Sequence, residues 1–165
     1  MSIYYQKQPV FTATPILKTK TFDPTIADRN WDEAMTSPVP IVIFDGSAVL
    51  TLGSEAGLIE RITVTNAMDL STSANYTSSE KLVWLYIQDI SNNIWVLYKT
   101  AHMPAADLSV AGTVNPEIEW TFTGGLAVNT NTKLGIMASA NYSTNNYYGD
   151  YLSVTVEGGD YTAVL

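Results

Sequence analysis

The sequence predicts an all-β fold, an antiparallel β-sandwich of about eight or nine strands. Short runs of β-branched and aromatic residues follow one another from residue 41 to the end, and turn-forming residues separate them. No stretch has a convincing helical period, and no stretch repeats. With 165 residues, of which 46% are hydrophobic, the chain can form one domain with a hydrophobic core.

Residues 81–100 carry the strongest strand signal. Two apolar runs flank the turn residues 89–93, a pattern that predicts a long antiparallel hairpin. The faces of the first run carry Val83, Leu85 and Ile87 on one side and Leu82, Trp84 and Tyr86 on the other. Apolar residues on both faces indicate a strand inside a sandwich or against a partner subunit. Its place in the middle of the strand series favours the core.

Residues 1–40 are expected to form an extended N-terminal arm, and residues 41–165 the sandwich domain. The arm contains five prolines, which interrupt helices and central strands, but it is too apolar for a free linker. Residues 1–22 hold Lys7, Lys18 and Lys20 and no acidic residue, whereas residues 38–165 carry a net charge of −8. A basic arm before an acidic body fits either a solvated tail or a segment that docks on the chain's own body or on a neighbour.

The other elements follow from alternation and turn chemistry. Asp45-Gly46 predicts a hairpin-type turn, Gly124-Gly125 a break, and residues 157–160 a turn before a closing segment. Residues 66–80, 102–116 and 141–149 are expected to be loops. Outside the hairpin strands 82–88 and 94–99, the predicted strands are 41–44, 48–52, 58–65, 117–123, 134–138 and 152–156.

The composition argues against several function classes. Phosphate binding needs clustered basic residues, so a net charge of −8 argues against nucleic acid. There is no apolar run of membrane-spanning length and no signal-peptide pattern, so we expect neither a membrane partner nor secretion. The chain has no cysteine. We expect no cofactor and no metal site.

Catalytic and metal-binding patterns are weak. The single histidine, His102, has no accompanying triad motif, and Glu117 and Glu119 alternate with apolar residues as the solvated face of a strand does. Two clusters could offer oxygen ligands to calcium, although turn chemistry explains both. They are Asp89 with Asn92 and Asn93, and Asn145 with Asn146 and Asp150. We therefore predict that the chain is not an enzyme.

Aromatic residues offer two kinds of binding surface. Tyr142, Tyr147, Tyr148 and Tyr151 lie in or beside one polar loop. An exposed aromatic row on a β-sandwich can stack against sugar rings, which makes a carbohydrate-binding module the alternative reading. Tyrosines also suit protein contacts, because they offer large, rigid and amphipathic area.

The order of several segments resembles small β-sandwich structural proteins of tailed bacteriophages. The resemblance covers residues 47–161 and leaves the arm uncovered. The segments that carry it are 49–51, the small-residue turn 53–57, 59–64, 83–89, 103–105, 117–122, 133–139 and the ending Gly158-Gly159-Asp160-Tyr161.

This resemblance implies a jelly-roll-like, non-enzymatic virion protein, assembled in the host cytoplasm and of the capsid decoration or auxiliary head type. Its partners would be the major capsid protein or other virion subunits, and a homo-oligomer, such as a trimer, is expected. Binding would use the arm and exposed loops. The candidate partner-binding residues are Tyr4, Tyr5, Phe11, Lys18, Lys20, Phe22, Trp31, Tyr142, Tyr147 and Tyr148.

Overall fold

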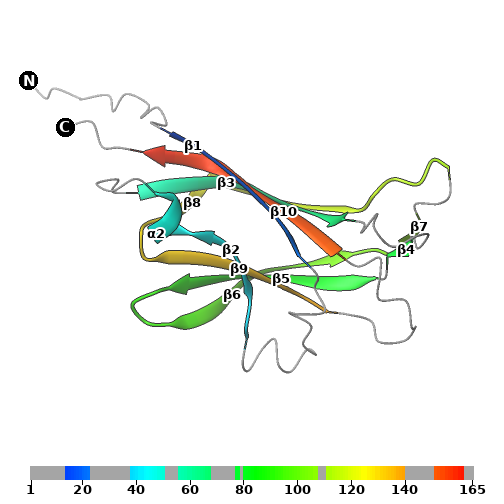
Figure 1. Cartoon of the computed structure of the whole chain (residues 1–165), viewed down its shortest axis with the longest axis horizontal. Helices are drawn as coiled ribbons and strands as arrows, with labels where there is room; N and C mark the ends of the chain where they lie inside the picture. The colour runs from blue at the N-terminus through cyan, green and yellow to red at the C-terminus, as the bar shows by residue number, and fades with distance from the viewer. Residues whose placement is uncertain are drawn as a thin grey trace, which may run out of the picture.

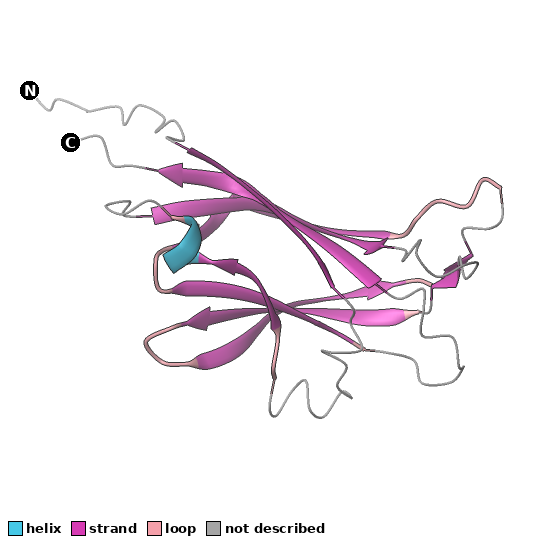
Figure 2. Ribbon diagram, in the orientation of Figure 1, coloured by secondary structure: helices cyan, strands magenta, loops and turns pink. Residues whose placement is uncertain are grey.

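The chain folds into two antiparallel four-stranded sheets packed face to face, which confirms the predicted β-sandwich (Figure 1). The computed structural model describes residues 14–22, 38–50, 56–67, 77–78, 80–107, 111–139 and 151–161. Strands dominate these residues, as Figure 2 shows, and the helix α2 (Gly46–Val49) is a single turn.

Each sheet is built from strands that are distant in the sequence. Sheet A has the order β1 (Thr14–Phe22), β10 (Tyr151–Tyr161), β3 (Ala56–Ala67) and β8 (Glu117–Val128). Sheet B has the order β2 (Ile41–Asp45), β9 (Thr132–Ala138), β5 (Lys81–Asp89) and β6 (Ile94–Met103). A small third sheet pairs β4 (Thr77–Ser78) with β7 (Ala106–Asp107).

Residues 14–22, which were expected in the arm, form an edge strand of sheet A. They pair with β10 in continuous register from Thr14 opposite Asp160 to Phe22 opposite Leu152. Ile16 and Phe22 point into the core, where they are 4% and 8% exposed. The Nζ atom of Lys20 donates to the carbonyl oxygen of Val42 at 2.9 Å, which links β1 to β2 of the other sheet.

The prediction of a strand at 48–52 is wrong over its first residues, because α2 occupies them. The Asp45 carboxylate caps the turn by accepting from the Ser47 amide at 3.0 Å and from the Ser47 hydroxyl at 2.6 Å. The Leu50 amide then donates to the Gly46 carbonyl oxygen at 3.0 Å. A capping side chain therefore makes a helical turn more favourable here than a tight hairpin.

Two glycine pairs that were expected to end strands lie inside them. Gly124 and Gly125 have φ values of +81° and +80°, and the pairing of β3 with β8 shifts register beside them. Gly158 lies at a register shift between β10 and β3, where a Cβ atom would approach the Leu58 carbonyl oxygen to 2.1 Å. Both pairs therefore mark bulges, which bend a strand and leave it continuous.

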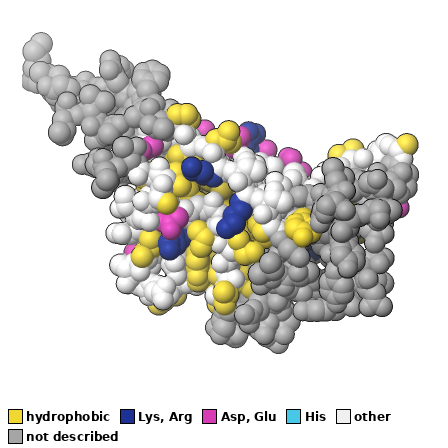
Figure 3. All heavy atoms as spheres, viewed as in Figure 1, with side chains coloured by type: hydrophobic (Ala, Val, Ile, Leu, Met, Phe, Trp, Pro, Cys, Tyr) yellow, Lys and Arg dark blue, Asp and Glu magenta, His cyan; other side chains and the backbone are white. Residues whose placement is uncertain are grey.

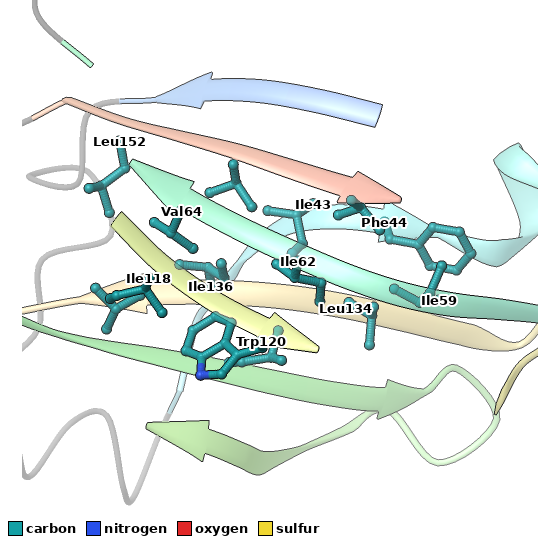
Figure 4. Packing of buried hydrophobic residues seen from close by; sticks show 14 of the residues in the cluster. Ile43, Phe44, Ile59, Ile62, Val64, Ile118, Trp120, Leu134, Ile136 and Leu152 are labelled. Carbon is teal, nitrogen blue, oxygen red and sulfur yellow. The ribbon is translucent and has the colours of Figure 1, made fainter. Parts of the chain in front are cut away.

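The expected hairpin at 81–100 is present as β5 and β6, and its core placement holds for β5. Val83 and Leu85 are fully buried between the sheets, in the core that Figure 4 shows from close by. Trp84 and Tyr86 belong to a second buried cluster with Met137, toward which Trp95 and Leu97 pack. The expected loop 102–116 is interrupted, because β6 continues to Met103 and β7 follows it.

Candidate functional site at the edge between β6 and β8

The last strand of sheet B, β6, exposes apolar side chains. Ile94, Val96 and Tyr98 are 63%, 56% and 42% exposed, although they alternate along the strand as core residues do. They share a face with Ile87 and Leu85 of β5, which faces sheet A. Because β6 is the edge strand, these side chains lie where the cover from sheet A ends.

Strand β8 forms the other side of this open edge. The rings of Tyr98 and Phe122 stack with their centroids 6.0 Å apart and their planes at 30°. The Lys99 Nζ atom lies 5.8 Å from the centroid of the Tyr98 ring. We call the surface formed by Ile94, Val96, Tyr98 and Phe122 the β6–β8 edge.

A shallow hollow of about 360 Å³ lies beside the stacked rings. It is lined by Tyr98, Lys99, Thr121, Phe122, Thr123, Gly125, Leu126 and Ala127. No carboxylate or imidazole lies among these lining residues, and the hollow offers aromatic contact area, hydroxyl groups and the ammonium group of Lys99.

Two bulges shape the edge. The pairing of β5 with β6 shifts between Leu85 and Tyr86, so Tyr98 is the extra residue on β6 and Lys99 pairs with Leu85. On β8 the positive φ values of Gly124 and Gly125 accompany the second bulge. Bulges at a sheet edge re-aim side chains, and here they bring Tyr98 and Phe122 together.

Three of the predicted partner-binding residues lie within the described part of the chain, and all are in β1. Lys18 is exposed, whereas the ammonium group of Lys20 is bound to the carbonyl oxygen of Val42. Phe22 packs in the core, so its ring contacts this chain. The others, Tyr4, Tyr5, Phe11, Trp31, Tyr142, Tyr147 and Tyr148, lie outside the described residues.

The face of the molecule seen in Figure 3 carries both basic and acidic side chains among its described residues. Lys and Arg side chains lie beside hydrophobic ones near the middle of its described part. Leu17 of β1, the residue before Lys18, is 64% exposed. Leu17 is the one large hydrophobic side chain exposed on the described residues of β1, and a single exposed hydrophobic side chain does not mark an interaction site.

Two of the candidate acid–base residues, His102 and Glu119, lie in exposed polar contacts. The Nε2 atom of His102 lies 2.7 Å from an oxygen of Glu80, and both side chains are more than half exposed. On the outer face of sheet A, Arg61 pairs with Glu157 and, at 3.5 Å, with Glu119. The hydrogen bond to Glu157 raises the pKa of Arg61 above its usual value. Ion pairs of this kind suit a solvated face, and they form no enclosed site.

The first calcium candidate acts as a turn cap. The Asp89 carboxylate accepts from the Ser91 amide at 2.9 Å and from its hydroxyl at 2.5 Å, and these bonds lower its pKa. Asn93 adopts φ = 52°, as the turn requires. Among the residues that the structure describes, no three His, Cys, Asp or Glu side chains gather in a metal-binding group. Asn145, Asn146 and Asp150 lie outside these residues.

Comparison of the chain with protein-family models, curated proteins and solved structures finds no match. In the described ranges no helix has the length and apolarity to span a membrane.

The β6–β8 edge was missed in the sequence because β6 resembles a buried strand. The run Ile94–Tyr98 contains five consecutive apolar residues, a pattern that predicts burial on both faces. Its exposure arises from its position at the end of the sheet, which local sequence does not encode. The signal that was available is Lys99, because a lysine in an otherwise apolar strand is typical of an edge.

Proposed function

We propose that this chain is a non-enzymatic structural protein of a tailed-phage particle that binds other protein subunits. The observation that carries subunit binding is the β6–β8 edge. Of the six large hydrophobic side chains that are exposed among the described residues, three lie on β6. Apolar side chains gathered in this way mark interaction sites, whereas scattered ones do not.

The strand order supports the phage-particle part of the proposal. With the two short strands β4 and β7 set aside, the strand order is β1-β10-β3-β8 in sheet A and β2-β9-β5-β6 in sheet B. We read this order as that of an eight-stranded jelly roll, an architecture that viral capsid domains and lectins share. Because one fold serves many functions, the order supports the proposal by analogy only.

The interaction would use two kinds of contact. The β6–β8 edge offers apolar and aromatic area, and the N-terminal residues that precede β1 offer the aromatic side chains of Tyr4, Tyr5 and Phe11 beside Lys7. Extended segments bind by adding a strand to a sheet edge or by filling a groove. On a particle with many equivalent sites, modest affinity at each contact gains from multivalency.

A carbohydrate-binding module is the alternative proposal, and the jelly-roll strand order is compatible with it as well. Among the described tryptophans, Trp84 and Trp120 are buried and Trp95 is half-buried. The described residues therefore support protein contact better than sugar stacking. The loop tyrosines Tyr147 and Tyr148 remain the residues on which the alternative depends.

Sedimentation with particles tests the proposal. The phage whose genome encodes this chain is produced with the gene deleted. Its particles are mixed with the purified chain and pelleted through a sucrose cushion. We expect the full chain to pellet in a saturable amount. A chain that lacks residues 1–13 keeps β1 and should fold, and we expect it to lose attachment.

Failure of the full chain to pellet at any concentration would contradict the proposal. Attachment at full occupancy by the shortened chain would contradict only the role of the N-terminal residues and not the rest of the proposal. Saccharide binding that is lost in Tyr147→Ala or Tyr148→Ala, without particle binding, would favour the carbohydrate-binding alternative.

A further inference from the structure

We propose that two copies of this chain associate about a twofold axis by pairing their β6 strands edge to edge, which joins their B sheets into one eight-stranded sheet. The inference rests on the proposed function in one respect, that the β6–β8 edge is a subunit interface. It goes further by naming the partner as a second copy and by giving the register.

The free edge of β6 is suited to antiparallel pairing with itself. Among the described residues, the ten-residue strand β6 pairs with β5 alone, so the backbone groups of its other side can pair with a further strand. It contains no proline. An edge strand of this length that carries exposed apolar side chains is a template for pairing with another chain.

The apolar run of β6 determines the register. Residues 94–98 are all apolar, and Val96 is at their centre. In an antiparallel ladder centred on Val96, Ile94 lies opposite the partner's Tyr98. Trp95 then lies opposite the partner's Leu97. Every apolar residue of the run thus meets an apolar residue, whereas a ladder centred on Leu97 places Trp95 opposite the partner's Lys99.

The charges at the ends of the run fit the same register. Lys99 falls opposite the partner's Asn93, in the turn that Asp89 closes. Lys99 therefore approaches the carboxylate of Asp89 of the partner subunit, and the twofold axis repeats this pair. Opposite charges near facing positions stabilise a strand pair and help to select its register.

The pairing also covers side chains that a monomer leaves in water. Ile94, Val96 and Tyr98 lie on the face of β6 toward sheet A, so in the joined sheet each packs beside the side chains of the partner's β6. Burial of these side chains removes apolar area from water, at about 25 cal/mol per Å² before the costs of association.

The other edge of sheet B and the β1 edge of sheet A differ from β6 in length and charge. The other edge of sheet B is β2, a five-residue strand with a register shift between Val42 and Phe44. The edge strand β1 of sheet A carries Lys18 and Lys20. Because the twofold axis uses β6 of both copies, the contact closes as an isologous dimer and leaves β2 of each copy at the outer edge of the joined sheet.

Disulfide trapping tests the register, because the chain contains no cysteine. Two residues that face each other in an antiparallel pair have Cβ atoms close enough for a disulfide to form with small backbone shifts. We expect Val96→Cys to form a covalent dimer under mild oxidation. We also expect a mixture of Ile94→Cys and Tyr98→Cys to form the mixed dimer. Val114→Cys is the matched control, because Val114 is 83% exposed and lies outside β6.

Sedimentation equilibrium of the full chain tests the dimer itself. We expect the wild-type mass to rise to that of a dimer with concentration, and Val96→Lys to remain monomeric because two lysines would face each other. Val114→Lys should behave as the wild type. A wild-type monomer at all concentrations, a trimer, or trapping of Val96→Cys no greater than that of Val114→Cys would overturn the inference.

The two proposals fail separately. If the wild-type chain is a dimer that Val96→Lys abolishes and neither pellets with particles, the dimer stands and the phage-particle function fails. If the chain pellets with particles but is monomeric in solution and resists trapping at Val96, the function stands and the dimer fails.

Discussion

The ring of Tyr98 on β6 stacks against the ring of Phe122 on β8, with the centroids 6.0 Å apart. This contact joins the last strands of the two sheets, β6 of sheet B and β8 of sheet A. Residue 98 is also the extra residue of a bulge. The pair therefore holds the β6–β8 edge in a defined shape while leaving Ile94 and Val96 accessible.

A double-mutant cycle measures this contact. At a low protein concentration, we expect Tyr98→Ala and Phe122→Ala each to lower the free energy of unfolding, with a coupling of about 0.5 to 1.5 kcal/mol beyond additivity. Urea unfolding of the two single variants and the double variant gives the coupling. Additive effects would show that the rings do not interact in solution. The pair Tyr98→Ala with Val114→Ala is the control, because Val114 is 83% exposed and lies outside both β6 and β8.

Strand β1 is predicted to be part of the domain and not a detachable arm. Phe22→Ala should lower the free energy of unfolding by about 3 to 5 kcal/mol, because the ring is buried in the core. Leu17→Ala on the same strand should change it by less than about 0.5 kcal/mol, because Leu17 is 64% exposed. Chemical denaturation of both variants tests this difference. Equal and small effects would show that residues 14–22 belong to an arm and not to the folded domain.

Close approach of the backbone makes Gly158 sensitive to substitution. In Gly158→Ala, the new Cβ atom would lie 2.1 Å from the Leu58 carbonyl oxygen, so β10 and β3 must separate locally. We expect a loss of about 3 kcal/mol, at the upper end for overpacking. Gly112→Ala is the control, since its Cβ atom meets nothing within 4 Å and only its φ of +89° costs energy, about 1 kcal/mol. A melting temperature of Gly158→Ala equal to that of the wild type in thermal unfolding would contradict this expectation.

The cap of α2 predicts a pH dependence. Burial raises the pKa of Asp45, but the hydrogen bonds from Ser47 and the interaction with Lys133 outweigh burial and lower the pKa below its usual 3.8. A folded-state pKa below the unfolded value stabilises the fold above about pH 4, and this stabilisation is lost as the pH falls through the folded-state pKa.

Asp45→Asn tests that dependence, because asparagine keeps a capping oxygen and does not titrate in this range. We expect the loss of unfolding free energy between pH 6 and pH 3 to be smaller in Asp45→Asn than in the wild type, as measured by urea unfolding. Ser47→Ala should reduce the same loss in part, because it removes one of the two bonds to the carboxylate. An unchanged slope in both variants would show that the cap is not coupled to pH.

The parts of the fold that local pattern specifies were predictable. Residues 117–123 alternate between Ile118, Trp120 and Phe122 on one side and acidic or hydroxyl side chains on the other, and they form the first part of β8. The hairpin of β5 and β6 was likewise visible, because β-branched and aromatic residues flank a polar turn. In both cases the information lies within about twenty residues.

The parts that depend on distant pairing were not predictable in this way. Pro15, Lys18 and Lys20 make β1 look irregular, and its partner β10 lies at the other end of the chain. Gly124 and Gly158 resemble strand ends in the sequence, but each lies at a bulge in a strand that stays paired with β3 on both sides of it. The exposure of Ile94 and Val96 depends on which strand is last in the sheet, which is a property of topology.

Hydrogen exchange at low and high protein concentration tests most directly the central claim, that β6 is the edge through which this protein associates. We predict that the amides of residues 94–98 that point away from β5 exchange more slowly at high concentration, and that Val96→Lys removes this protection. The amides of β1 should not change with concentration. Exchange of residues 94–98 that is independent of concentration, or protection that appears at β1 and not at β6, would contradict the account.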